Sequence, residues 1–114
     1  MEYDLEERTC EFAKRCRNFV ITLPKTTANI EYSKQLIRSS GSQAANYIEA
    51  NEKLSKKDFV FRMKIVRKET KESALWLRLC EINDDQKLEN ETKKLLQEST
   101  ELRNIFSAII KKSE

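Results

Sequence analysis

The sequence contains no histidine, and it has only one glycine and one proline among its 114 residues. Without histidine, the chain lacks the usual general base and the Ser-His and Cys-His pairs that activate nucleophiles. The Glu-x-x-His ligand pattern of di-iron helical bundles is missing for the same reason. Because each strand of a large sheet needs its own turn, so few glycines and prolines argue against a β-rich fold.

Long apolar runs and cysteine motifs are also missing. No segment is apolar over the roughly 18 residues that a membrane span requires, and the charged start MEYDLEERT is unlike a signal peptide. The three cysteines, Cys10, Cys16 and Cys80, show no metal-binding spacing. We therefore expect reduced thiols in a cytoplasmic protein with no membrane contact, no metal and no cofactor.

Charged residues make up 36% of the chain and apolar residues 39%, a mixture typical of exposed helices that each bury one stripe. Periodicity and capping residues predict four helices in a single domain spanning residues 1–114. Four amphipathic helices with short loops predict an all-α fold, an antiparallel up-down-up-down four-helix bundle. The expected helices run from Asp4 to just before Pro24, onward from Thr26 or Thr27, from Ser55 to about Ile82, and onward from the turn at 83–85.

Apolar residues in each helix recur at alternating spacings of four and three, which predicts one core-facing stripe per helix. Gly41 interrupts the second helix, but the pattern resumes in register after it. We expect a continuous helix that a neighbouring backbone approaches closely at Gly41; the alternative is a break there. The expected core contains Phe12, Phe19, Leu36, Phe59, Met63, Leu77, Leu95 and Phe106.

The net charge is only +3, yet residues 55–82 hold eight basic and four acidic side chains. Wound at 100° per residue, eight of the lysine and arginine side chains in residues 53–78 fall within an arc of about 120°, and the acidic ones lie outside it. Such segregation is typical of a surface that binds phosphates, although a solvated face would look the same. The predicted nucleic-acid-binding residues are Lys53, Lys56, Lys57, Lys64, Arg67, Lys68, Lys71 and Arg78.

A second apolar sector of the third helix holds Phe61, Ile65, Trp76 and Leu79. One bundle needs only one apolar stripe per helix, and monomers rarely expose such a patch. We interpret the sector as a subunit interface, in which Trp is a favoured anchor. The alternative is a wide stripe that the core covers.

Several strings of the chain resemble one protein family: 35–42 (QLIRSSGS), 45–51 (ANYIEAN), 55–59 (SKKDF), Lys68-Glu69 with Glu72, and Trp76-Leu77. They resemble the four-helix bundle proteins encoded by intervening sequences in bacterial large-subunit ribosomal RNA genes. The accessory protein of diversity-generating retroelements is similar. The resemblance implies an up-down bundle, a homopentameric ring and, in the retroelement relatives, contacts with nucleic acid and a reverse transcriptase.

Polar residues within these strings predict contacts between helices. Gln43 and Ala44 stand where the family usually has Val-Gly, so a larger polar group enters the contact region. Arg38, Asn46 and Glu49 lie near the core-facing stripe, and buried polar groups need partners. We expect them to bond one another or the Glu69 and Glu72 side chains, in a structural role.

Two functions follow from these observations, and neither is enzymatic. The first is a non-enzymatic oligomer that binds RNA or DNA nonspecifically through the third helix. The alternative is a protein-binding scaffold with no nucleic-acid role, whose basic face only keeps it soluble. The expected partners are other copies of the chain, RNA or DNA, and a reverse transcriptase or another protein.

Overall fold

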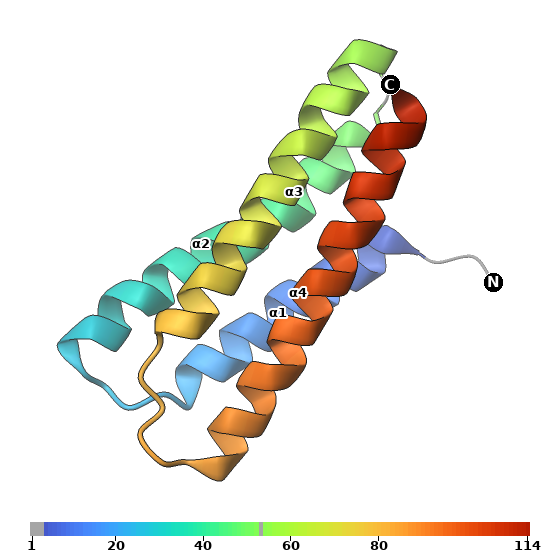
Figure 1. The fold of residues 1–114 in the computed structure, drawn as a ribbon. Coiled ribbons are helices and arrows are strands. Elements are labelled where there is room, and N and C mark those ends of the chain that lie inside the picture. Colours follow the sequence, from blue (N-terminus) through green and yellow to red (C-terminus); the bar gives the residue numbers. More distant parts are fainter. Residues whose placement is uncertain (1–3, 53) are drawn as a thin grey trace.

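The computed structural model describes residues 4–52 and 54–114, which form four α-helices (Figure 1). At each N-terminus a side-chain oxygen accepts a backbone N–H that the helix cannot pair. These caps are Asp4, Thr26, Ser55 and Asp85. The helices are α1 (Leu5–Ile21), α2 (Thr27–Ala50), α3 (Lys56–Leu79) and α4 (Gln86–Ser113). The predicted all-α class and the predicted start of each helix are confirmed.

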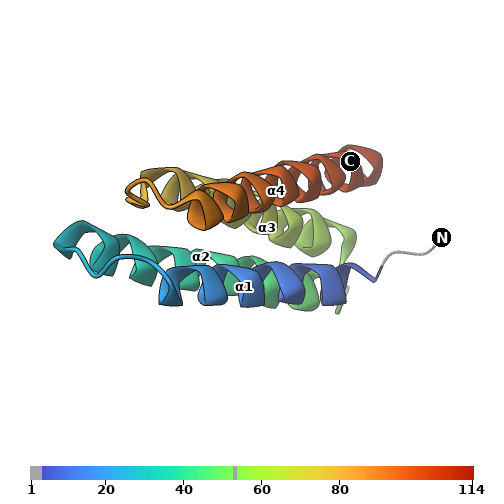
Figure 2. The same cartoon turned by 90° about the horizontal axis from the view of Figure 1, so that it is seen from below.

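The helices pack as two layers, with α1 and α2 in one and α3 and α4 in the other (Figure 2). Each helix contacts its neighbour in the sequence, and α1 also contacts α4, so the four enclose a single core. Seven of the eight predicted core residues are buried. Phe59 is the exception: it is only partly buried, because it lies where the bundle opens at one end.

The stripe of α2 differs from the prediction. The apolar spacing of the sequence places Ile37 and Ile48 in the core-facing stripe of the second helix together with Leu36, but they are 47% and 48% exposed. Polar Asn29 and Gln43 are buried instead. Gln43 donates from Nε2 to the backbone oxygens of Thr9 (2.8 Å) and Ser40 (3.0 Å), which compensates part of its desolvation.

Asn29 connects the two loops at one end of the bundle. Its Nδ2 donates to the carbonyl oxygens of Pro24 (2.9 Å) and Glu81 (2.8 Å), and its Oδ1 accepts from the backbone N–H of Glu81 (2.8 Å). Both backbone groups of Glu81 are therefore bonded to Asn29 rather than within α3. The chain leaves the helix at the preceding residue, Cys80, whose ψ is 137°. Helix α3 therefore ends at Leu79 rather than at the predicted Ile82.

Gly41 lies within an uninterrupted α2, as predicted. The expected close approach of another backbone is wrong for the single chain, because a Cβ at Gly41 would meet no atom within 4 Å. The residue is exposed. A glycine in the middle of a helix lowers its stability relative to alanine, and no packing contact at Gly41 within the described residues explains that cost.

Phe106 and Phe59 differ in how completely they are buried, and this difference gives a test of the core. Phe106 is 0% exposed, so Phe106→Ala should lower the free energy of unfolding by about 3–5 kcal/mol. Phe59→Ala should cost only about 1–2 kcal/mol, since part of its ring already contacts water. Urea unfolding of both variants measures the difference. Equal losses would contradict this description of the core.

Candidate nucleic-acid interface

Helix α3 carries its acidic residues on the side that packs against α2. Arg38 of α2 places Nη2 3.1 Å from Glu72 Oε1 and 3.4 Å from Glu69 Oε1. Nearer the start of α3, Arg62 pairs with Glu49 of α2 at 2.8 Å and with Asp58 of its own helix at 3.7 Å. The acidic side of α3 is thus neutralised at its contact with α2.

The predicted contacts of the polar residues on α2 are partly confirmed. Arg38 bonds Glu69 and Glu72 as expected. The prediction is wrong for the other two residues. Asn46 donates to the backbone oxygen (2.9 Å) and hydroxyl (3.1 Å) of Ser42 in its own helix, and Glu49 pairs with Arg62. Glu49 lies eleven residues beyond Arg38, about 16 Å further along α2, and therefore beside Arg62 rather than Glu69.

The basic residues of α3 face solvent on the other side. Lys57, Lys64, Lys68 and Lys71 are all exposed, and their spacings of seven, four and three residues align them along one line of the helix. We call these four residues the basic line. Within residues 4–52 and 54–114, Lys57, Lys68 and Lys71 take part in no ion pair, and Lys64 Nζ lies 3.3 Å from Glu114 Oε2 at the end of α4.

The remaining predicted residues lie beside this line or away from it. Lys56 and Arg78 are exposed. Arg67 is half-buried, and its Nη1 donates to Ser107 Oγ of α4 (3.3 Å), so it turns toward the neighbouring helix. Lys53 lies outside the described residues. Sequence reasoning did not include the exposed Lys111 and Lys112 of α4, because only the fold brings the end of α4 beside the start of α3.

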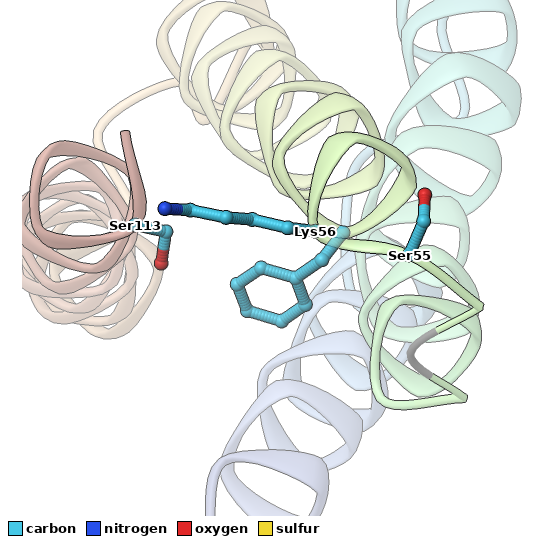
Figure 3. A pocket seen from close by; sticks show the side chains of 4 residues that line it. Ser55, Lys56 and Ser113 are labelled. Atoms are coloured by element: carbon cyan, nitrogen blue, oxygen red, sulfur yellow. The ribbon is translucent and has the colours of Figure 1, made fainter.

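A cavity of about 430 Å³ opens where α3 begins and α4 ends (Figure 3). Ser55, Lys56, Phe59 and Ser113 line it. The Lys56 side chain points toward Ser113, whereas Ser55, the helix cap, points away. A neighbouring cavity includes Lys57, Phe61 and Lys64 among its lining residues, so the basic line begins at this open end of the bundle.

The predicted interface sector on α3 divides into exposed and covered parts. Phe61 and Leu79 are 60% and 41% exposed. Ile65 is half-buried, and Trp76 packs against the core with its ring 6.1 Å from that of Tyr32 on α2. Leu75, which the sequence prediction omitted, is also exposed. The apolar surface available to a partner on α3 therefore centres on Phe61, Leu75 and Leu79.

Comparison with known proteins identifies the family of this bundle. The family model described as 23S rRNA-intervening sequence protein matches residues 1–108. The chain belongs to this family.

A solved structure supports the assignment. This chain is similar to a protein of unknown function from the S23 ribosomal protein family of Bacteroides thetaiotaomicron VPI-5482. The two chains are 29% identical, with a TM-score of 0.77, and the match covers 93% of this chain and 97% of the other. No curated protein matches the chain.

Further features of the described residues concern metal ligands, membrane-spanning helices and the two buried cysteines. Among residues 4–52 and 54–114, no three His, Cys, Asp or Glu side chains gather as metal ligands. No helix in the same part of the chain is long and apolar enough to cross a membrane. Burial raises the pKa of Cys16 to about 12 and that of Cys80 to about 11, which keeps both thiols protonated even above their ordinary pKa of 9.0.

These thiols give a second testable prediction. In the native protein, exposed Cys10 should react with a thiol reagent while buried Cys16 and Cys80 stay protected until denaturant is added. Their ordinary pKa is 9.0, so above that pH the unfolded chain loses protons that the folded chain retains. The free energy of unfolding should therefore fall as pH rises above 9.0. Rapid reaction of all three thiols in the native state would contradict the buried placement.

Proposed function

We propose that this protein is a non-enzymatic, oligomeric bundle that binds RNA or DNA with little sequence preference through the basic line of α3. The observation that carries the proposal is the division of charge on α3. Its acidic side chains are paired with Arg38 and Arg62, whereas the lysines of the basic line face solvent. A nucleic acid therefore meets positive charge that, apart from the pairing of Lys64 with Glu114, is not neutralised within the described residues.

The dimensions of the basic line suit a phosphate backbone. Lys57 and Lys71 are 14 residues apart, which is about 21 Å along the helix axis. Phosphates of one strand are spaced about 3.4 Å along a duplex axis, so the line can follow several of them. Lysine contacts phosphate as a point charge and reads no base, which is why little sequence preference is expected.

Assembly would strengthen this weak surface. The sequence resemblance implies a homopentameric ring of antiparallel up-down bundles, and Phe61, Leu75 and Leu79 supply exposed apolar surface for a subunit contact. In such a ring the basic lines repeat, so individually weak contacts add through multivalency. The reduced, buried cysteines suit a cytoplasmic oligomer.

The alternative function is a protein-binding scaffold, for a reverse transcriptase or another protein, with no nucleic-acid role. The exposed Phe61 favours it, since an aromatic side chain that is 60% exposed is a common anchor in protein interfaces. In that case the basic line only solubilises the chain.

Charge reversal tests the proposed function. Changing Lys57, Lys64, Lys68 and Lys71 to Glu should weaken binding to a labelled RNA or DNA oligonucleotide at least about tenfold at low salt, because each contact with phosphate is lost. A matched control reverses four exposed lysines elsewhere: Lys14, Lys25, Lys87 and Lys94. Fluorescence anisotropy measures both, and circular dichroism confirms that each variant is helical.

The control separates a defined surface from net charge. The two variants change the net charge by the same amount, so equal losses would show that only the overall charge matters. If the wild-type protein binds neither RNA nor DNA at low salt, the scaffold function takes the place of the proposed one.

The proposed assembly has its own test. Light scattering at micromolar concentration should give several times the chain mass of 13.5 kDa. Phe61→Glu should lower that mass, because burying a carboxylate at the contact is unfavourable. A monomeric wild-type protein would contradict the proposed assembly. Nucleic-acid binding would then rest on the single basic line of one chain.

A further inference from the structure

The cavity at the open end of the bundle has an aromatic wall. It lies where α3 begins and α4 ends, and its volume of about 430 Å³ is in the range of small-ligand sites, roughly 300–1,000 Å³. Phe59 lines it and is only partly buried, whereas the other phenylalanines predicted for the core are at most 2% exposed. The bundle therefore leaves part of one phenyl ring open to a ligand.

Two polar side chains lie beside this ring. Lys56 is the one charged residue among the described residues that line the cavity, and its side chain points toward Ser113 of α4 (Figure 3). The Ser113 hydroxyl donates to the Ile109 carbonyl at 2.8 Å, which leaves its oxygen lone pairs as acceptors. The cavity thus combines an aromatic wall, a cationic donor and a hydroxyl acceptor. A nucleobase, which is flat with donors and acceptors along its edge, suits these three groups.

The cavity adjoins the basic line of α3. A neighbouring cavity of about 530 Å³ shares Lys56 and Ser113 with it and is also lined by Lys57 and Lys64. At 100° per residue, Lys56 lies between Phe59 on one side of the helix and Lys57 on the other. Lys57 and Lys64 are about 10 Å apart along the axis, a length that corresponds to about three phosphate spacings of one strand. A strand that follows the basic line therefore reaches the aromatic wall at its end.

The carboxylates nearest this end of α3 are paired with cations. Asp58 Oδ1 lies 3.7 Å from Arg62 Nε, and Glu114 Oε2 lies 3.3 Å from Lys64 Nζ. Neither carboxylate belongs to the described residues that line the cavity beside Phe59. The pair of Glu114 with Lys64 is exposed, so it is weak and a phosphate can replace the carboxylate.

We propose that this cavity binds one unstacked base of a single-stranded RNA or DNA, with the base against the Phe59 ring and its phosphate at Lys56. This inference rests on the proposed function, because the basic line holds the rest of the strand. Every base has an aromatic face, so the site accepts any base and adds little sequence preference. A base within a duplex must first be unpaired and unstacked, which costs free energy. The site therefore distinguishes an unpaired base from a paired one.

Two labelled strands of equal charge test the base site. One is a single-stranded oligothymidine, and the other is an abasic strand of the same length, which keeps the phosphates but lacks the bases. At the same salt concentration the wild-type protein should bind oligothymidine at least about fivefold more tightly, because only that strand can stack on the ring. Fluorescence anisotropy measures both affinities. Equal affinities would overturn the base site and leave phosphate binding by the basic line in place.

A substitution at Phe59 tests whether this ring carries the preference. Phe59→Leu keeps an apolar side chain of similar size but has no aromatic face, so the preference for oligothymidine should disappear while the abasic strand binds as before. The control is Tyr32→Leu, which removes a partly buried ring that lies against Trp76 and outside the cavity. An unchanged preference in Phe59→Leu, or an equal loss in Tyr32→Leu, would contradict the proposal.

Filling the cavity gives a second test that leaves the Phe59 ring in place. Ser113→Leu adds apolar volume at the end of α4, so the base should be excluded and the preference should again disappear. A preference that survives this substitution would place the base elsewhere and overturn the proposal.

The same measurements keep the base site and the proposed function apart. If both strands bind with equal affinity, the base site alone fails. If the wild-type protein binds neither strand at low salt, the proposed function fails, and the base site fails with it.

Discussion

The ion pairs between Arg38 and the carboxylates of Glu69 and Glu72 fix how α3 lies in the bundle. The Glu69 side chain is only 9% exposed, and an unpaired buried carboxylate would be strongly unfavourable. Arg38 reaches it from α2 at 3.4 Å. Beside this pair, Ser39 and Ser73 share a hydrogen bond of 2.7 Å across the same helix contact. Rotating α3 about its axis would break both interactions at once, so its orientation is set by polar as well as apolar contacts.

The surface properties of the protein follow from that orientation. With the acidic side of α3 turned toward α2, Met63, Val66 and Leu77 face the core, and the basic line faces solvent. A chain with a net charge of only +3 can therefore present one concentrated positive surface. The proposed binding of nucleic acid depends on where charges are paired rather than on how many the chain carries.

Much of the fold could be predicted from local sequence signals. The caps at Asp4 and Ser55 and the regular spacing of apolar residues in α1, α3 and α4 depend on neighbours within one helix, and these predictions are confirmed. Predictions failed where a contact with a distant part of the chain determines the position of a side chain. Asn29 and Gln43 are buried because they bond the chain at Glu81 and Thr9, and Arg67 turns toward Ser107 of α4. The position of the basic line was predictable because it shares the periodicity of α3, whereas the proximity of Lys111 and Lys112 required the packed bundle.

The most direct test of the account is the salt dependence of oligonucleotide binding by the wild-type protein. If four lysines contact phosphates of a single strand, the logarithm of the association constant should fall with the logarithm of salt concentration with a slope of about −3, at about −0.7 per contact. That slope would show that binding releases the counterions expected for contacts between four lysines and phosphates. A slope near zero would contradict the central claim that charge division on α3 creates the binding surface.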